Sequence, residues 1–458
     1  MTAEDFEGLR SDVIEHVWPP RLPWNEFTAP GGITIFVEGK GCRITDVQGK
    51  TYLDFFSCFQ CNDVGYGRRE LADVAREQMA KLHLSPQHEP SLPKIRLAKK
   101  LAEITPGSLS KAYFTTGGTE TIETALKMVK KYQRNLGFPG RYKLIGECTF
   151  HGMTYGAMST GWRKGAFTFE DYEPLVPGMV FISPPYCATC ELGLKYPTCN
   201  LACAKQVEAI IQRENPETIA GFIGTPIVLQ AHFPPKEYWP MIRAICDKYG
   251  IPLIFDEIQS GFGRWGTMFA CEHYDVVPDI MCVAKGITSG YMPLGATITT
   301  KEFAQKFEGG PKEKLVHGFT YEGHPVSCAV ALAHLEILER EKLVENSAKM
   351  GRYLYEQVQS FDRHSIVGDI RGGLGLVCAI DLVKNKKTKE RFGAQENRII
   401  ASLLKKKLMA LGLYGPFTNP IVIQPPLIVT KDEIDEIVRG FDTVIGEIGK
   451  ELSIPHKS

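Results

Sequence analysis

The sequence lacks an excess of charge of either sign. Its 458 residues contain 53 Lys and Arg and 53 Asp and Glu, so the formal net charge is zero. A protein that binds the phosphates of nucleic acid usually carries a basic surplus or a basic stripe, and none is visible here. We therefore expect small-molecule substrates and no nucleic-acid partner.

The sequence also lacks a hydrophobic run long enough to cross a membrane. It begins MTAEDF, which is acidic and does not have the basic and then apolar regions of a signal peptide. We expect a cytoplasmic protein without a membrane partner. Because the cytosol keeps thiols reduced, the 13 Cys are more consistent with free thiols than with a disulfide framework.

What the sequence does contain is enough apolar material for a sizeable core, with 43% hydrophobic residues. Short apolar runs alternate with segments of helical period, such as 119–132 and 236–249. This alternation predicts an α/β fold with a mostly parallel sheet and helices on both of its faces. The expected strands are 111–115, 143–146, 179–182, 220–224, 251–255 and 280–284.

The order of these patterns along the chain predicts two domains. Residues 41–55 resemble a β-hairpin, and residues 366–383 resemble a second, smaller sheet that follows a long helical segment. We expect a large domain at 61–325 and a smaller α+β domain at 326–458. The N-terminal segment, 1–60, is expected to pack with the small domain.

An acidic pair, Asp256 and Glu257, ends one of the apolar strand runs. A buried carboxylate is costly unless its charge has a partner. The protonated ring nitrogen of a bound cofactor would be such a partner, and Gln259 follows closely. A helix cap or a structural Asp–Arg pair would explain the same residues.

A lysine, Lys285, ends the next apolar run and enters a glycine-rich turn. A lysine that is removed from water has a lowered pKa and becomes a usable amine nucleophile. Most lysines are solvated surface residues, so it is the combination with Asp256 that favours a catalytic function.

Two further motifs follow expected strands. Residues 115–120, TTGGTE, lie between a strand and an amphipathic helix, where glycines and free backbone N–H groups can bind a phosphate. This is not a Walker loop, because no Gly-Lys-Ser/Thr follows. Phe150 could stack on a planar ring, or it could be an ordinary core aromatic.

Together, these four motifs resemble the class III, pyridoxal-phosphate (PLP)-dependent aminotransferases of fold type I. The resemblance extends from the hairpin at 41–55 to the stretch at 424–427. It implies that PLP is the cofactor, that Lys285 holds it as a Schiff base, and that Asp256 keeps its pyridine nitrogen protonated. Lys285 and Asp256 are thus the expected catalytic residues.

The same resemblance implies further cofactor contacts. Gln259 matches the residue that hydrogen-bonds the phenolic oxygen of the cofactor, and Gly118 and Thr119 match the phosphate-binding turn. Phe150 matches the aromatic residue that stacks on the ring. Thr320 resembles a phosphate ligand that comes from the partner subunit, which implies a homodimer with shared active sites.

The chain departs from the family pattern at two places. Thr225 stands where the family usually has Glu, and residues 411–424 contain neither the usual carboxylate-binding Arg nor any Lys. Either another cation binds the acid, for which Arg163 and Lys164 are candidates, or the reaction differs. Residues 61–67 look most like the ω-amine transaminase branch.

We therefore predict an aminotransferase that moves an amino group from an amine or ω-amino acid to a 2-oxo acid. The alternative is a PLP-dependent lyase, eliminating from an aminoalkyl phosphonate, phosphate or similar amine, or an epimerase. A non-enzymatic relative would usually have lost Lys285 or Asp256. A Rossmann dehydrogenase is disfavoured because residues 372–375 lack the full dinucleotide spacing.

Four cysteines form a cluster with the spacing C-x2-C-x8-C-x3-C. Two close pairs separated by a short loop suit a tetrahedral structural zinc site. Buried free thiols or regulatory disulfides are the alternatives, and no catalytic function is expected. The cluster consists of Cys187, Cys190, Cys199 and Cys203.

Overall fold

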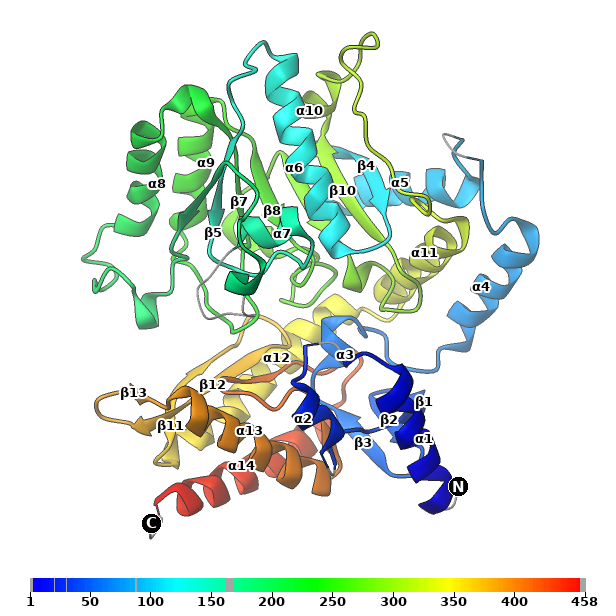
Figure 1. The fold of residues 1–458 in the computed structure, drawn as a ribbon, viewed down its shortest axis with the longest axis vertical. Coiled ribbons are helices and arrows are strands. Elements are labelled where there is room, and N and C mark those ends of the chain that lie inside the picture. The colour runs from blue at the N-terminus through cyan, green and yellow to red at the C-terminus, as the bar shows by residue number, and fades with distance from the viewer. Residues whose placement is uncertain (1–2, 20, 30, 87–88, 162–168, 454–458) are drawn as a thin grey trace.

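The computed structural model describes residues 3–19, 21–29, 31–86, 89–161 and 169–453. The upper part in Figure 1 is built on a seven-stranded sheet of order β4-β10-β9-β8-β7-β5-β6. All neighbouring strands pair in parallel except β10, which is antiparallel to β4 and β9, so the prediction of a mostly parallel sheet is confirmed. The strands are β4 (Leu109–Thr115), β5 (Lys143–Glu147), β6 (Met179–Ile182), β7 (Ile219–Gly224), β8 (Leu253–Asp256), β9 (Ile280–Val283) and β10 (Gly295–Thr300).

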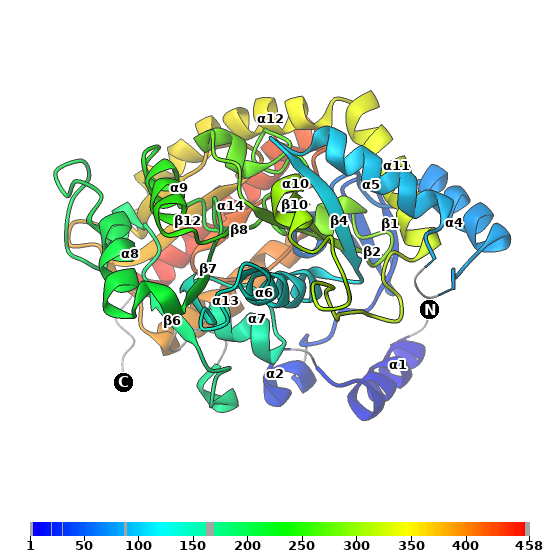
Figure 2. The same ribbon diagram turned by 90° about the horizontal axis from the view of Figure 1, so that it is seen from above.

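Helices cover both faces of this sheet, which explains why its inner strands are apolar throughout. Side chains alternate along a strand, so Ile254 packs in one cluster with α6 (Gly118–Asn135), whereas Phe255 packs with α9 (Tyr238–Tyr249) in another. Seen from above in Figure 2, α6 lies on one side of the strands and α9 on the other. Helices α7 (Tyr155–Thr160), α10 (Lys301–Gln305) and α5 (Leu92–Ile104) also contact the sheet, and α8 (Ala202–Arg213) packs against α9.

A second sheet joins the two ends of the chain. The predicted hairpin is confirmed as β2 (Arg43–Asp46) and β3 (Thr51–Asp54), which pair antiparallel. β1 (Phe36–Lys40) pairs with β2, and β14 (Leu413–Tyr414) pairs in parallel with β3. The N-terminal segment therefore pairs directly with a C-terminal strand.

The lower part in Figure 1 contains the third sheet, whose strands come from the C-terminal residues. β12 (Cys378–Asn385) pairs with β11 (Val367–Arg371), β13 (Glu390–Arg391) and β15 (Ile421–Ile423). Long helices pack in this region: α12 (Leu343–Val358), α13 (Ala394–Ala410) and α14 (Lys431–Ser453). The domain boundaries near residues 60 and 325 stay predictions.

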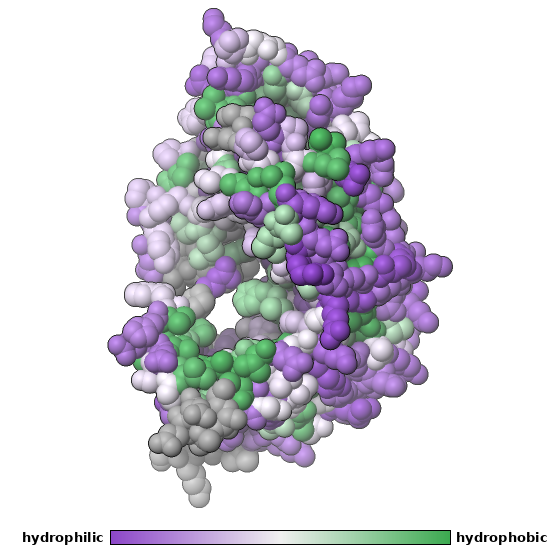
Figure 3. All heavy atoms as spheres, turned by 90° about the vertical axis from the view of Figure 1, so that its right-hand side faces the viewer, coloured by the Kyte–Doolittle hydropathy of each residue, from purple (hydrophilic) through white to green (hydrophobic). Residues whose placement is uncertain are grey.

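The side of the molecule turned to the viewer in Figure 3 carries α4 (Arg69–Lys81), α5 (Leu92–Ile104) and α11 (Pro325–Arg340), which pack together. Hydrophobic side chains gather at several places on this face. The N-terminal helices α1 (Ala3–His16) and α2 (Trp24–Thr28) and the short α3 (Ser57–Gln60) complete the chain. Within the described ranges, no helix is long and apolar enough to span a membrane.

Candidate active site

Three of the predicted loops meet at the carboxyl ends of strands of the seven-stranded sheet, where ligands bind in sheets of this kind. The loops follow β4, β8 and β9. A Cβ added to Gly118 would lie 3.0 Å from Cγ2 of Ile258 and 3.5 Å from Cβ of Ala284. Gly118 therefore permits close contact between the expected phosphate-binding turn and the loops that carry Asp256 and Lys285.

Asp256 is held in place by two hydrogen bonds at the end of β8, where it is only 4% exposed. Its Oδ2 lies 2.7 Å from Nδ1 of buried His151, and its Oδ1 accepts from the backbone N–H of Ile258 at 3.0 Å. Nε2 of His151 lies 3.0 Å from the hydroxyl of Thr149. Local sequence patterns could not indicate the His151 contact, because it joins residues 105 positions apart.

The neighbouring carboxylate, Glu257, serves a different purpose. It is fully buried and accepts hydrogen bonds from the hydroxyl of Ser260 and from the backbone N–H groups of Ala270 and Cys271. Burial raises the pKa of Glu257 to about 7. Glu257 thus fixes the loop after β8, while Asp256 is the acid that contacts His151.

Lys285 follows β9 and lies near Asp256. Burial lowers the pKa of its amine, and the negative charge of Asp256 opposes this effect. A larger fraction of the amine is therefore neutral and able to act as a nucleophile or base. The Nζ atom lies 3.4 Å from Oε1 of Gln60. A Cβ at Gly286 would lie 2.7 Å from Oδ2 of Asp63, so the Lys-Gly pair allows the chain to pass this carboxylate.

Gln60 belongs to a turn with unusual backbone geometry. All four residues of α3, 57–60, have positive φ values of 51°, 43°, 65° and 67°, and none of them is glycine. Left-handed backbone is unfavourable for such residues, so surrounding contacts must hold it. The hydroxyl of Ser57 donates to the carbonyl of Gln424 at 2.7 Å, and the N–H of Cys58 donates to Asp54 at 2.7 Å.

A buried ion pair fixes the segment that follows this turn. Arg264, which ends the motif Gly-Phe-Gly-Arg at residues 261–264, contacts Asp63 at 2.6 Å, and both side chains are 3% exposed. Arg264 also donates to the carbonyl of Pro425 at 2.7 Å and to the hydroxyl of Ser57 at 3.1 Å. The motif thus connects the N-terminal segment, the loop after β8 and the stretch near residue 425.

The expected phosphate-binding turn opens α6, which begins at Gly118. The first N–H groups of a helix have no partner within the helix and carry a positive partial charge, so they can bind a phosphate. The hydroxyl of Thr119 accepts from the backbone N–H of Met153 at 3.1 Å. This bond ties the turn to the loop that carries Phe150.

The remaining predicted residues lie at different depths. Phe150 and Gln259 are half-buried, in the loops that follow β5 and β8. Thr320 is exposed, on the loop that precedes α11. Arg163 and Lys164, the candidate carboxylate-binding residues, lie outside the described residues.

Arg21 is a cation at this site that the sequence analysis missed. Its guanidinium carbon lies 5.3 Å from the centroid of the Phe150 ring and 6.0 Å from that of Phe59. The segment around it contains no pattern that would distinguish it from other surface arginines, so only the fold could reveal it.

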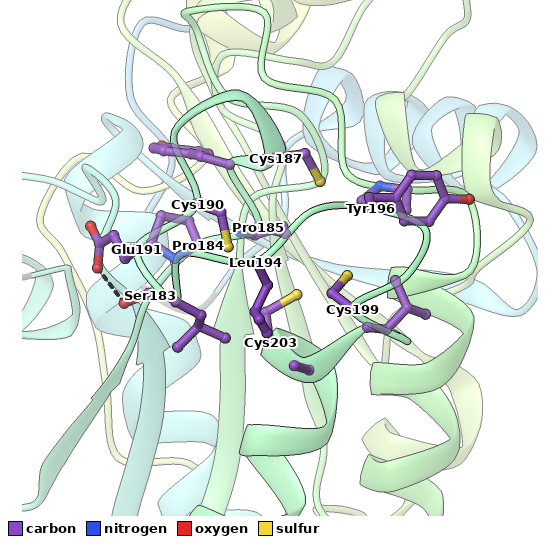
Figure 4. Close-up of a pocket in the computed structure, with 15 residues that line it drawn as sticks. Ser183, Pro184, Pro185, Cys187, Cys190, Glu191, Leu194, Tyr196, Cys199 and Cys203 are labelled. Carbon is purple, nitrogen blue, oxygen red and sulfur yellow. Dashed lines mark hydrogen bonds between the residues drawn. The ribbon is translucent and has the colours of Figure 1, made fainter. Parts of the chain in front are cut away.

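The four clustered cysteines line one small cavity of about 30 Å³, away from these loops (Figure 4). Burial raises the pKa of the Cys187 thiol, and the neighbouring Cys199 and Cys190 contribute. However, no group of three or more His, Cys, Asp or Glu side chains in the described part of the chain is placed to hold a metal. The expected zinc site at Cys187, Cys190, Cys199 and Cys203 is therefore not supported.

The site has the features that PLP requires of a protein of fold type I. It offers a buried carboxylate, a lysine whose amine is largely removed from water, and a glycine-rich helix start, all at one edge of the sheet. Residues 29–445 match the family described as Aminotransferase class-III, and the chain belongs to this family.

Individual relatives cover nearly the whole chain. A putrescine–pyruvate aminotransferase of Pseudomonas aeruginosa is 35% identical over 95% of this chain and 94% of its own length. A diaminobutyrate–2-oxoglutarate transaminase of Halomonas elongata is 33% identical over 93% and 92%. The structure of an (S)-enantioselective ω-transaminase from Thermomicrobium roseum has a TM-score of 0.91 and 37% identity, covering 97% of this chain and 98% of that one. The protein is thus a PLP-dependent transaminase that transfers an amino group to a 2-oxo acid.

Proposed function

We propose that this transaminase takes its amino group from an amine or an ω-amino acid, with Lys285 and Asp256 as its catalytic residues. One observation carries the assignment of these residues. Asp256 ends β8, Lys285 follows the adjacent parallel strand β9, and the loops after these strands contact the start of α6 at Gly118. The carboxylate of Asp256, the amine of Lys285 and the phosphate-binding turn are therefore close enough together for one small cofactor to contact all three.

Bound PLP supplies an electron sink for the carbon that carries the amino group. The carboxylate of Asp256 would stabilise the protonated ring nitrogen, and His151 would orient that carboxylate. The N–H groups at Gly118 and Thr119 would bind the phosphate. Phe150 would stack on the ring, and Gln259 would hydrogen-bond its phenolic oxygen.

Lys285 would hold the cofactor through its amine and then act as the base. Because burial lowers its pKa, the neutral Nζ would accept the proton of the substrate carbon and would then donate it to the carbon of the cofactor that takes up the amino group. Oε1 of Gln60, 3.4 Å away, would orient this amine.

The donor class is inferred from one stretch of the chain, where the family usually has a carboxylate-binding Arg. Residues 411–424 contain no Arg or Lys, so this stretch offers no clamp for the α-carboxylate of an amino acid. One relative is named for putrescine, an amine without a carboxylate, and another for diaminobutyrate, which carries two amino groups, and these names support an amine or ω-amino acid donor.

We also propose a homodimer in which Thr320 contributes to the partner's site. Thr320 is exposed, and its loop contacts α5, because a Cβ at Gly323 would lie 2.8 Å from Cδ of Lys94. Exposed hydrophobic side chains lie on α4, on α5 and on the segment between these helices, on the side of the molecule shown in Figure 3, and an exposed hydrophobic patch marks an interaction surface. These side chains are Met79, Leu82, Leu84, Leu92 and Ile95.

A spectroscopic titration tests the proposed donor. The purified holoenzyme is mixed with a panel of amines, ω-amino acids and aminoalkyl phosphonates and phosphates, without any oxo acid. A true donor should bleach the visible absorbance of the bound cofactor stoichiometrically. The absorbance should return only when pyruvate or 2-oxoglutarate is added.

Two results would contradict the proposal. Product that accumulates over many turnovers while the absorbance persists would indicate a lyase or an epimerase. A Lys285→Ala variant that kept both turnover and the visible absorbance would disprove the assignment of Lys285. The exposed Lys450→Ala, on the C-terminal helix α14, is the control, and it should behave as the unmodified protein.

A further inference from the structure

Arg21 lies at the candidate active site although it precedes the other site residues by more than thirty positions. Its guanidinium is within cation–π distance of the Phe150 and Phe59 rings, at 5.3 and 6.0 Å. Its backbone φ of 59° lies in the left-handed region, which residues other than glycine rarely adopt. Such strain is often retained where it serves a binding site.

Arg21 also shares its surroundings with the reacting amine. Burial is the main cause of the lowered pKa of Lys285, and the positive charge of Arg21 lowers that pKa further. The guanidinium is therefore close enough to influence the amine electrostatically. A substrate bound at Lys285 would feel the same charge.

The chemistry of a transaminase creates a need for such a cation. Every 2-oxo acid carries a carboxylate beside the carbonyl that receives the amino group, and residues 411–424 contain no Arg or Lys. A guanidinium binds a carboxylate through two parallel N–H···O bonds at its edge. Stacking on aromatic rings engages the flat face of the guanidinium, so both contacts can form together.

We propose that Arg21 binds the carboxylate of the 2-oxo acid acceptor, so that the N-terminal segment determines the preference for acids. This inference rests on the proposed transaminase site and adds the residue that recognises its acidic substrate. It also explains how one site accepts in turn a donor without a nearby carboxylate and an acceptor that has one.

The test compares acceptors with and without a carboxylate. Holoenzyme carrying Arg21→Gln or Arg21→Lys is assayed with pyruvate and with butanal, at a fixed concentration of the donor found in the titration. Binding of propionate, which cannot react, is measured in parallel by calorimetry. Losing a charge-assisted bidentate contact should raise the KM for pyruvate and the Kd for propionate by about 10- to 100-fold in Arg21→Gln.

The kinetic constants for butanal should change less than about twofold in the same variant, because this aldehyde offers no anion to pair. Arg21→Lys should recover part of the loss. Arg213→Gln is the matched control, since this arginine is exposed at the end of α8, on the opposite side of the molecule from α1 in Figure 1. It should leave all of these constants unchanged.

Equal effects on pyruvate and butanal would overturn the proposal and show a structural effect of Arg21. Unchanged pyruvate and propionate constants in Arg21→Gln would overturn it as well. If the unmodified enzyme transferred no amino group to any acceptor, the proposed donor and site would fail instead. Propionate binding would still decide whether Arg21 binds carboxylates.

Discussion

His151 positions the carboxylate of Asp256, and two substitutions can separate the effect of this contact on kcat from the effect of the charge. Asp256→Ala removes the charge and should lower kcat by about 10²- to 10³-fold. His151→Ala keeps the charge but removes its 2.7 Å contact, so we expect a loss of about 10-fold, as for other residues that orient a reacting group. Steady-state kinetics and the visible absorbance of the cofactor measure both effects.

His151→Asn is the informative control for this prediction. An Asn side chain can place its amide N–H near the position of Nδ1 and donate to Asp256, so it should restore most of kcat. If His151→Asn and His151→Ala lowered kcat to the same extent, His151 would fill space and would not position the carboxylate of Asp256.

The raised pKa of Glu147 lets us predict how the stability of the protein depends on pH. This residue is fully buried at the end of β5, where the hydroxyl of Tyr238 donates to it at 2.8 Å. Burial raises its pKa from 4.5 to about 8. The folded state thus keeps a proton that the unfolded chain releases, so the stability that this proton contributes is full below pH 4.5 and is lost as the pH rises to 8.

Glu147→Gln removes this titration, because the amide stays neutral at every pH. The melting temperature of the unmodified holoenzyme should fall between pH 5 and pH 8 more steeply than that of the variant. Since one pKa unit corresponds to about 1.4 kcal/mol, the difference should reach a few kcal/mol. Parallel pH profiles of the two proteins would refute the buried, protonated state of Glu147.

At the scale of the element, the left-handed turn at 57–60 should contain removable strain. Non-glycine residues in left-handed backbone cost about 1–2 kcal/mol each, and glycine avoids this cost at about 0.5–1 kcal/mol of extra chain entropy. Cys58, with φ of 43°, is exposed. Cys58→Gly should therefore leave the free energy of unfolding unchanged or raise it by up to about 1 kcal/mol.

Cys61→Gly is the matched control, because Cys61 lies just beyond the turn with φ of −111°. There glycine relieves no strain, so the same substitution should cost about 0.5–1 kcal/mol. Chemical denaturation of both variants measures the difference. If Cys58→Gly were as destabilising as Cys61→Gly, the turn would store no strain at this position.

The elements that the sequence predicted and those that it did not differ in physical character. β8 and β9 are buried on both faces, so their sequences are apolar runs, apart from Asp256 at the end of β8, and a strand prediction recognises them. β10 was missed: its sequence, GATITT, is half threonine, and Thr297 satisfies its hydroxyl by donating to the carbonyl of Thr121 at 2.9 Å. That bond exists only in the folded chain.

The site shows the same division. Asp256 ends a strand, and Lys285 and Gly118 each follow one, so local patterns could indicate them and the sheet then brings their loops together. The turn at 57–60 contains no glycine that would indicate its left-handed backbone. Arg21 is brought to Phe150 by tertiary packing alone. Local sequence therefore predicts the proposed cofactor contacts and misses Arg21, which we propose to lie on the substrate side.

At the scale of the whole molecule, the hydrophobic face around α5 should decide the oligomeric state. Ile95 lies on α5 and is 52% exposed, near the loop that carries Thr320. Ile399 lies on α13 in the lower part of Figure 1 and is 46% exposed, so it is a matched isoleucine on a different surface. The two sites permit the same substitution in two environments.

Ile95→Asp buries a charge in the proposed interface and should shift the protein toward monomers, since an unpaired buried charge costs several kcal/mol, whereas Ile399→Asp should stay dimeric. Light scattering coupled to size-exclusion chromatography measures the mass of each variant.

If Thr320 completes the partner's site, the Ile95→Asp monomer should also bind PLP more weakly. The Thr320→Ala variant should bind PLP more weakly as well, although it stays dimeric. If the Ile95→Asp variant stayed fully dimeric, the interface would lie elsewhere. If the Thr320→Ala variant were dimeric and kept its affinity for PLP, each subunit would bind its cofactor alone.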